Sequence, residues 1–553
     1  MGEVTVPVDR LDQPSTTTTG STDLGDDTVT EILLAVFREV LSVERVEPDS
    51  RFYALGGDSL TALRVVAEAR ARGVPIALRD LLVHQTVAGL VGARPARHPE
   101  RATEPQRRQP FGLLDAADRA LLPEGVVDAL PASALQVGML YLCEVSQDPM
   151  LYHVAGGWEV CAPFAEDTFR TALTRLTDRH PALRTSFDLG GLSLPTQLVW
   201  PRGAATLTVE HATDDAHADT LVRRWLDRQL GTPVDWAVPA LVRWHVVVLP
   251  TSFRVVVTAH HTVLDGWSFS RLGVDLMMLY DAALSGREPD LPATAPDVHQ
   301  DFLVLERQAA ASATAEAHWL AQANGPEPLL GWGTPGRIAD PRERYAFRLD
   351  RETVRSLTGV ARMLGVSVKS VTLAAHARAL GTWAGRDHDV VTGLVFNTRP
   401  ARVGTDLVTG LFLNTLPVRF ATVDTTWANL VRAASDAERD SAPYQAFPQA
   451  RLVEILGRPA FDVTFNFMNF HAQQDIDRLE RLPTRSWWRQ GKPSFPFHVN
   501  VEIVGAEGQV RIGFDSAFVA RDAVEAYAGM LRDALAALLA NPVSPAAPTR
   551  IGG

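Results

Sequence analysis

The chain has 553 residues, of which 46% are hydrophobic and 21% are charged, so we expect most of it to fold into packed domains, more than one at this length. Aspartate and glutamate number 65 against 53 lysines and arginines, which gives a formal net charge of -12. This balance argues against a general nucleic-acid-binding protein, because binding to phosphates requires a basic surface.

The cysteines and the N-terminus indicate the cellular environment of the protein. Cys143 and Cys161 belong to no CxxC or Cys/His cluster, so we predict no metal site and a reducing, cytoplasmic environment. Residues 1–25 contain neither a signal peptide nor an apolar stretch of about 18 residues. We therefore expect a soluble protein that does not associate with membranes.

Apolar spacing predicts a small helical domain near the N-terminus. Thr28 and Glu31 have the spacing of a capping box, and apolar residues recur at helical intervals over 28–42. A second apolar stripe begins at Leu60 and ends near Gly73, and shorter helical pieces follow. The predicted units are a linker over 1–26, a helical bundle over 27–93 and a Pro/Arg-rich linker over 94–110.

The rest of the chain alternates β-branched runs with helical stripes, which predicts a large α/β domain. The strand-like runs at 244–249 and 253–260 are separated by a short turn, so we predict a β-hairpin there. Helices are predicted over 267–285, 353–364, 369–383 and 521–540.

The first chemical feature is the segment FYALGGDSLTAL, residues 52–63. Two glycines precede Asp58 and Ser59, and an amphipathic helix follows. The Ser59 hydroxyl would lie at a helix N-terminus, where unpaired N–H groups and the helix dipole favour a phosphate. The alternative is that Asp58 or Ser59 is only a helix N-cap.

The second chemical feature is HHTVLDGWS, which follows the predicted strand 253–260. A neutral histidine at a strand end can accept a proton near pH 7, so one of the two histidines, His260 or His261, is a candidate to assist an amine nucleophile. A shared metal is disfavoured, because adjacent strand residues point to opposite faces. A purely structural role for both histidines stays open, and the chain has no GxSxG motif for a serine triad.

Both features resemble known families. The LGGDSL segment and its helical setting resemble the peptidyl carrier protein family over nearly all of 27–93. HHxxxDG is matched in full and resembles the condensation domain family, part of the chloramphenicol-acetyltransferase-like superfamily, over about 111–545. Further segments match its other motifs in order, namely LPASALQVGMLYL at 130–142, RHPALRTSF at 179–187, FNTRP at 396–400 and TGLFLNTLPVRF at 409–420.

The resemblance implies a fold and domain limits. We expect a small all-α four-helix carrier domain followed by an α/β condensation domain made of two chloramphenicol-acetyltransferase-like halves in a V with a central tunnel. The predicted halves cover 111–295 and 296–545, and a linker covers 546–553.

The resemblance also implies residue roles. Ser59 would carry a covalent 4'-phosphopantetheine arm, and His261 would be the catalytic residue. Asp265 would be structural and pair with an arginine, for which Arg399 is the candidate, while His260 would serve packing. Gly266 would allow close approach of the substrate backbone, and the region of Trp267 and Ser268 would lie near the acceptor and the developing oxyanion.

The function that follows is amide formation in a nonribosomal peptide synthetase, with the Ser59 arm as donor of an aminoacyl or peptidyl thioester. The partners expected are a phosphopantetheinyl transferase, an upstream adenylation domain, and downstream adenylation and carrier domains. His261 could deprotonate the amine, hydrogen-bond it, or stabilise the intermediate. An epimerisation domain and an inactive docking platform are the alternatives, and LDGWS is closer to the subtype that accepts D-configured donors, although a glycine donor would also fit.

Overall fold

The computed structural model describes residues 25–93, 109–146, 148–203, 206–295, 297–331, 342–386, 389–469, 476, 479–491 and 495–546. The predicted linkers 1–26, 94–110 and 546–553 lie largely outside these residues. Within the described part of the chain, no helix is both long enough and apolar enough to cross a membrane.

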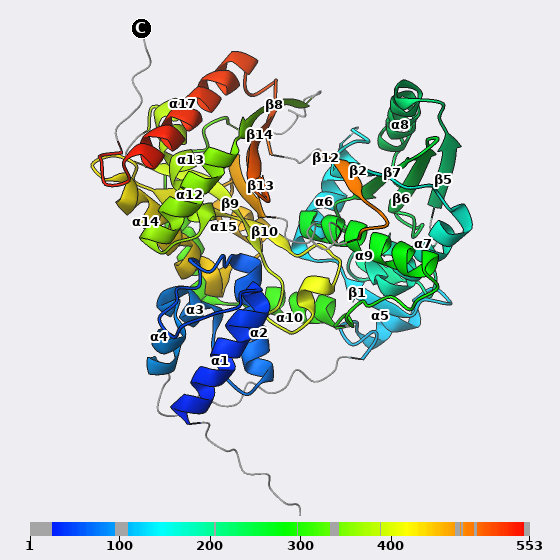
Figure 1. Ribbon diagram of the computed structural model, residues 1–553, viewed down its shortest axis with the longest axis horizontal. Coiled ribbons are helices and arrows are strands. Elements are labelled where there is room, and N and C mark those ends of the chain that lie inside the picture. The colour runs from blue at the N-terminus through cyan, green and yellow to red at the C-terminus, as the bar shows by residue number, and fades with distance from the viewer. Residues whose placement is uncertain are drawn as a thin grey trace, which may run out of the picture.

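The N-terminal region is the predicted helical bundle, drawn in blue in Figure 1. Its core packs Val29, Leu33 and Phe37 of the first helix against Phe52 and the second helix. The predicted capping box is wrong: the helix begins at Asp26, so Thr28 already lies in its first turn, where two aspartates complement the helix dipole. The helices are α1 (Asp26–Leu41), α2 (Ser59–Ala71), α3 (Leu78–His84) and α4 (Val87–Gly92).

A five-stranded sheet forms one half of the remaining chain, with strand order β12-β2-β7-β6-β5. The predicted hairpin is confirmed, because β6 and β7 pair antiparallel. Helices α7 and α9 bury apolar residues against one face, and α8 packs Trp225 on the other. The bounds are β2 (His153–Val160), α7 (Glu166–Arg179), β5 (Thr206–His211), α8 (Asp215–Leu230), β6 (Val242–Val248), β7 (Phe253–His260) and α9 (Gly266–Leu284).

A six-stranded sheet forms the other half, with strand order β10-β9-β11-β13-β14-β8. Helices α12, α13, α14 and α17 contribute to one large apolar core with this sheet, and three of them match predicted helices. The bounds are β8 (Arg342–Leu349), α12 (Arg351–Leu364), α13 (Val368–Ala384), β9 (Val390–Asn397), β10 (Leu413–Phe420), α14 (Trp427–Ser441), β11 (Val463–Asn469), β13 (Phe497–Val504), β14 (Glu507–Asp515) and α17 (Arg521–Ala540).

Smaller elements complete the described chain. A three-stranded sheet has the order β1-β4-β3. The bounds are α5 (Ala116–Ala120), β1 (Asp128–Pro131), α6 (Ala134–Val145), β3 (Thr185–Asp188), β4 (Thr196–Val199), α10 (Val298–Ala310), α11 (Ala313–Ala323) and α15 (Gln449–Leu456).

One strand crosses between the two halves. Strand β12 (Thr484–Gly491) lies between β11 and β13 in the sequence, yet it pairs antiparallel with β2 at the edge of the five-stranded sheet. Figure 1 shows this orange strand beside β2, away from the strands that flank it in the chain. A division of the chain at residue 296 does not anticipate this exchange, because strand pairing depends on a partner that is distant in sequence.

Candidate functional site

The segment from His261 to Gly266 forms the turn between β7, which ends at His260, and α9, which begins at Gly266. The backbone N–H of His261 donates to the carbonyl of Tyr152 at 2.9 Å, and that of Asp265 donates to the carbonyl of Gly410 at 2.9 Å. The Asp265 carboxylate caps α9 by accepting the N–H of Ser268 at 2.7 Å. The turn is therefore fixed at several points, which is what a reaction centre requires.

Asp265 pairs with Arg399, the residue that the sequence proposed as its partner. Arg399 Nη1 lies 2.8 Å from Asp265 Oδ2, and Nη2 lies 3.2 Å from Oδ1, so the contact is bidentate. Both side chains are buried. Burial opposes the charge of Asp265, but Arg399 holds the pKa of this carboxyl below its ordinary value. Since Asp265 precedes α9 and Arg399 follows β9, the pair joins the two halves.

The two histidines of the motif have different surroundings. His260 is fully buried against Trp236, Tyr152 and His153, and its Nδ1 lies 2.9 Å from the Thr262 hydroxyl. Burial lowers the pKa of His260 well below its ordinary value. His260 is therefore enclosed by the side chains around it, and the packing role assigned to it stays a prediction.

His261 is half-buried, and burial lowers the pKa of its imidazole below the ordinary value. Its Nδ1 is buried and makes no hydrogen bond among the described residues. A histidine with a lowered pKa is neutral at pH 7, so His261 can accept a proton or a hydrogen bond.

The expected acceptor and oxyanion residues are partly engaged in structural contacts. The indole N–H of Trp267 donates to the carbonyl of Asp406 at 2.8 Å. The hydroxyl of Ser268 is buried, donates to the carbonyl of Gly410 at 2.9 Å and accepts from Arg399 at 2.8 Å. Ser268 thus supports the Asp265–Arg399 pair, while Gly266 and Trp267 face a cavity.

This cavity, of about 370 Å³, lies between the carrier region and the rest of the chain. The carrier lines it with Gly56, Gly57, Asp58 and Leu60, which surround the start of α2, and the turn lines it with Gly266 and Trp267. Arg399 and Met468 add to the same wall. The cavity therefore connects the neighbourhood of Ser59 to that of the motif, as a tethered arm would require.

Ser59 is the first residue of α2, and Asp58 is the N-cap. The Asp58 carboxylate accepts the N–H groups of Leu60 at 3.1 Å and Thr61 at 2.9 Å. The capping alternative thus holds for Asp58, and Ser59 is not needed as a cap. This arrangement fits a phosphopantetheine attached to Ser59, because the glycines beside it open onto the cavity.

Several contacts hold the carrier region against the rest of the chain. Arg64 on α2 forms an ion pair with Asp406, with Nε and Oδ2 3.5 Å apart. Ala401 packs against the carrier core, and α3 contacts α14. Figure 1 shows the blue helices directly below the half that contains α14.

Sequence reasoning missed several residues that shape the site. Tyr152 has φ 58°, in a region few non-glycine residues adopt, and its carbonyl holds His261. At Gly410, an added Cβ would lie 2.5 Å from His299 Nε2, so only glycine fits there. Gly410 stands in the TGLFL motif and could have been found, whereas Arg489, on β12, has no local signal.

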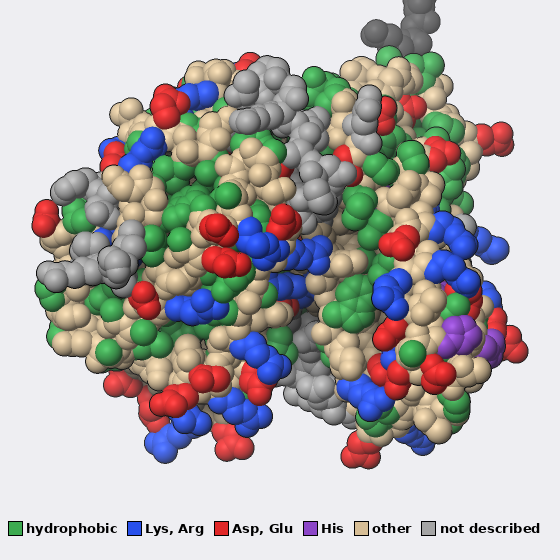
Figure 2. Space-filling view, turned by 90° about the horizontal axis from the view of Figure 1, so that it is seen from above, with side chains coloured by type: hydrophobic (Ala, Val, Ile, Leu, Met, Phe, Trp, Pro, Cys, Tyr) green, Lys and Arg blue, Asp and Glu red, His purple; other side chains and the backbone are tan. Residues whose placement is uncertain are grey.

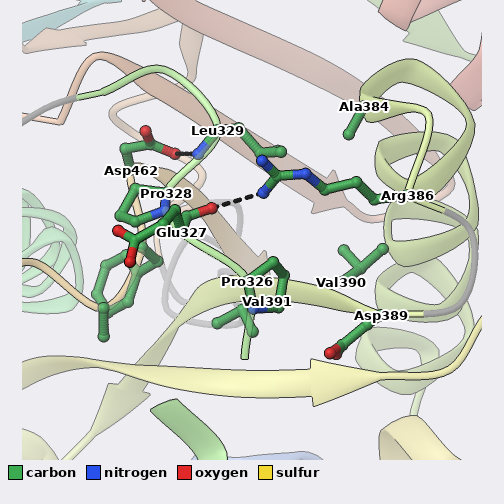
Figure 3. Close-up of a pocket in the computed structure, with 12 residues that line it drawn as sticks. Pro326, Glu327, Pro328, Leu329, Ala384, Arg386, Asp389, Val390, Val391 and Asp462 are labelled. Carbon is green, nitrogen blue, oxygen red and sulfur yellow. Dashed lines mark hydrogen bonds between the residues drawn. The ribbon is translucent and has the colours of Figure 1, made fainter. Parts of the chain in front are cut away.

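A second, small cavity lies in the half formed by the six-stranded sheet, with room for about one water molecule. There the Asp462 carboxylate accepts the N–H of Leu329 at 3.0 Å, and Arg386 donates to the carbonyl of Glu327 at 2.6 Å (Figure 3). These contacts anchor an irregular segment to the sheet. The residues that line this cavity include none of the predicted site residues.

Comparison with known families decides what the chain is. The model of the condensation domain family matches residues 126–551, and that of the phosphopantetheine attachment site matches residues 31–93. The chain belongs to the condensation domain family. This family consists of peptide-bond-forming acyltransferases, and the condensation domain here follows a phosphopantetheine carrier domain, as in nonribosomal-peptide-synthetase-like proteins.

Relatives of the carrier–condensation pair are much longer proteins. The AMB antimetabolite synthetase AmbE of Pseudomonas aeruginosa is 35% identical over 532 residues, which cover 93% of this chain and 25% of that protein. Tyrocidine synthase 2 of Brevibacillus parabrevis is 25% identical over 537 residues, which cover 92% of this chain and 14% of that protein. This chain therefore spans a quarter or less of these relatives.

Solved condensation domains share the fold. The condensation domain of the Monacolin K polyketide synthase MokA has a TM-score of 0.65 at 19% identity and covers 77% of this chain and 100% of that one. The first condensation domain of the calcium-dependent antibiotic synthetase, solved with a substrate analogue, has a TM-score of 0.64 at 19% identity over 76% of this chain and 98% of that one. The helical carrier and α/β condensation domain that the sequence predicted are thus confirmed.

Proposed function

We propose that this chain forms an amide bond, using its own carrier, residues 27–93, as the donor and its condensation domain, residues 111–545, as the catalyst. The observation that carries the proposal is the cavity that runs from Asp58 to Gly266. With the carrier bound at this cavity, the loop before Ser59 lies on the same cavity as the end of the HHxxxDG motif. Gly266 and Trp267, which follow His261 in the same motif, line this cavity together with the glycines beside Ser59, so we propose that the donor reaches His261 through it.

Phosphopantetheine on Ser59 would supply the thiol that carries the donor as a thioester. The amine of an aminoacyl thioester on a downstream carrier attacks the donor carbonyl, so that a C–N bond forms and the C–S bond breaks. One proton leaves the amine and finally protonates the released thiolate. The reaction needs no oxidant or further reactant.

His261 is proposed to act on the attacking amine. Its burial and lowered pKa support a neutral imidazole, which can take the proton or hold the amine by a hydrogen bond. Asp265, through Arg399, is proposed to hold the turn rather than to touch the substrate, because both of its oxygens are occupied by Arg399, Ser268 and Phe412.

A surface on α6 supports the approach of a second carrier. Val137, Tyr141 and Val145 are 37%, 65% and 52% exposed and follow one another at helical spacing, so they form an apolar stripe on one face. Gln136, at the start of the same helix, donates to the carbonyl of Thr262 at 2.8 Å, within the turn 261–266, which we call the catalytic turn. We infer that the acceptor carrier docks on this stripe, which begins at the reaction centre.

The test is an intact-mass assay on the whole chain. Phosphopantetheinyl transferase and glycyl-coenzyme A load the chain, and a separate glycine-loaded carrier domain serves as acceptor. We expect a dipeptidyl acceptor, no loading of Ser59→Ala, and loading without transfer for His261→Ala. A loaded chain that transfers nothing to a panel of aminoacyl acceptors would indicate the docking platform, and inversion of a loaded L-alanine donor would indicate the epimerisation domain.

A further inference from the structure

Arg489 reaches the catalytic turn from the crossing strand β12. Its Nη1 donates to the carbonyl of Gly266 at 3.2 Å and to the hydroxyl of Ser270 at 3.3 Å. Its Nη2 donates to Glu502 Oε1 at 2.9 Å. One guanidinium therefore touches the start of α9 in one half and β13 in the other.

Glu502 is buried and fully engaged around Arg489. Its other oxygen lies 2.9 Å from Arg511 Nη2 and 2.8 Å from Gln509 Nε2, both on β14. Arg511 also donates to the carbonyl of Arg489 at 2.9 Å. The position of the Arg489 guanidinium is thus set by the six-stranded sheet and not by β12 alone.

The catalytic turn is held from two sides. Arg399 binds it through Asp265, and Arg489 binds it through the next residue, Gly266. The two arginines come from separate segments, and each links the two halves. Figure 2 shows the groove between the halves from above, with basic side chains gathered in it.

The bond to Gly266 also fixes the following N–H group. The carbonyl of Gly266 and the N–H of Trp267 belong to one planar peptide unit and point in opposite directions. The N–H groups in the first turn of a helix have no intrahelical partner, so that of Trp267 can serve a substrate oxygen. The Ser270 hydroxyl also donates to this carbonyl, at 3.3 Å, so Arg489 and Ser270 together set the direction in which the Trp267 N–H points.

We propose that Arg489 is a positioning residue, which orients the Gly266–Trp267 peptide beside His261 and makes that orientation depend on contact with Glu502 of the other half. The proposal rests on the amide-forming function proposed above. Arg489 does not touch the reacting atoms. Its loss should affect the rate constant of transfer more than the binding of substrates.

The electrostatics of His261 provide a second readout. Burial lowers the pKa of His261, the charge of Asp265 raises it, and the charge of Arg489 lowers it further. Arg399 faces Asp265 and Glu502 faces Arg489, while the neighbouring His260 is neutral through burial. Removing the Arg489 charge should therefore raise the pKa of His261, whereas a lysine at this position should leave it nearly unchanged.

The experiment compares Arg489→Met, Arg489→Lys and the control Arg485→Met on the loaded chain, with glycyl-N-acetylcysteamine as a soluble acceptor. Arg485 lies on the same strand but pairs with Glu159, outside the catalytic turn. We expect Arg489→Met to lower kcat roughly tenfold to a hundredfold with KM within about twofold. The kcat of Arg489→Lys should be at least threefold higher than that of Arg489→Met. The kcat of Arg485→Met should equal that of the parent.

The pKa of His261 is measured in parallel by NMR of histidine-labelled protein, assigned with His261→Gln. This readout does not need turnover, so it remains informative if the parent forms no amide. If Arg489→Met does not fold, the uncharged variant Arg489→Gln supplies both readouts in its place. The proposal is overturned if every folded, uncharged Arg489 variant keeps kcat within twofold of the parent. It is equally overturned if the pKa of His261 in Arg489→Met does not rise above that in the parent.

Discussion

Arg64 of the carrier and Asp406 of the condensation domain form an ion pair, with Nε and Oδ2 3.5 Å apart. The carbonyl of the same Asp406 accepts the indole N–H of Trp267, next to the catalytic turn. One residue thus contacts both the carrier region and Trp267, beside the proposed reaction centre.

Reversing the charge in Arg64→Glu should slow transfer of a carrier-bound donor about two- to fivefold, because a partly exposed ion pair contributes little, whereas repulsion between the introduced glutamate and Asp406 would oppose docking. The measurement is the single-turnover rate of the loaded chain. A donor supplied as a soluble pantetheine thioester should be transferred at the parent rate. The double variant Arg64→Glu with Asp406→Arg should recover the loss, and equal slowing of both donors would contradict a docking role.

Asp265→Asn should destabilise the condensation domain by about 3–5 kcal/mol, because it leaves the Arg399 charge buried without its partner. Urea denaturation at pH 7 measures this free energy of unfolding. Combining Asp265→Asn with Arg399→Met should recover part of the loss, since neither charge of the pair then remains buried without the other. Independent, additive effects of the two changes would show that the pair is not coupled.

The rate of transfer should depend on pH through His261. Because the folded pKa of His261 is lowered by burial, the imidazole is neutral above that pKa and charged only below it. The rate should therefore be constant from pH 7 to 8 and should fall only as the pH drops below about 6.5, the ordinary histidine value. His261→Ala should slow transfer roughly a hundredfold to ten-thousandfold. The fall in rate at acidic pH should also disappear in this variant.

Tyr141→Asp should impair transfer to a carrier-bound acceptor by roughly tenfold or more, because it places a charge in the centre of the apolar stripe on α6. Transfer to the soluble acceptor glycyl-N-acetylcysteamine should be unchanged. The matched control is Leu121→Asp, since Leu121 is 64% exposed, close to the 65% of Tyr141, but lies outside α6. Equal loss with both acceptors would assign Tyr141 to the fold instead of to docking.

Local sequence patterns predicted much of the fold and the centre of the site. The hairpin of β6 and β7 follows from two β-branched runs with a short turn, and the motif after it locates His261 and Asp265. Arg399 could be predicted because it lies in the FNTRP segment, 396–400, which matches a separate family motif. The start of α1 was predicted wrongly, because two aspartates at the helix N-terminus replace the side-chain cap that the spacing of Thr28 and Glu31 indicates.

The residues that β12 adds to the site could not be predicted from local sequence patterns. Its sequence, TRSWWRQG, lacks a regular alternation, and its pairing with β2 contains a register shift between Arg485 and Trp488. Its partner strand is distant in the chain, so no short window encodes the contact. Arg489 acquires its place beside Gly266 only from that pairing.

The pairing of β12 with β2 also determines when the five-stranded sheet can be completed during synthesis on the ribosome. The strands β2, β5, β6 and β7 leave the ribosome early, but the edge of their sheet at β2 is covered only when residues 484–491 have been made. Until then β2 exposes unpaired backbone groups, a state prone to wrong pairing. The nascent chain thus completes its first half only after β12 has been made, and a truncated product lacking β12 would be a target for chaperones.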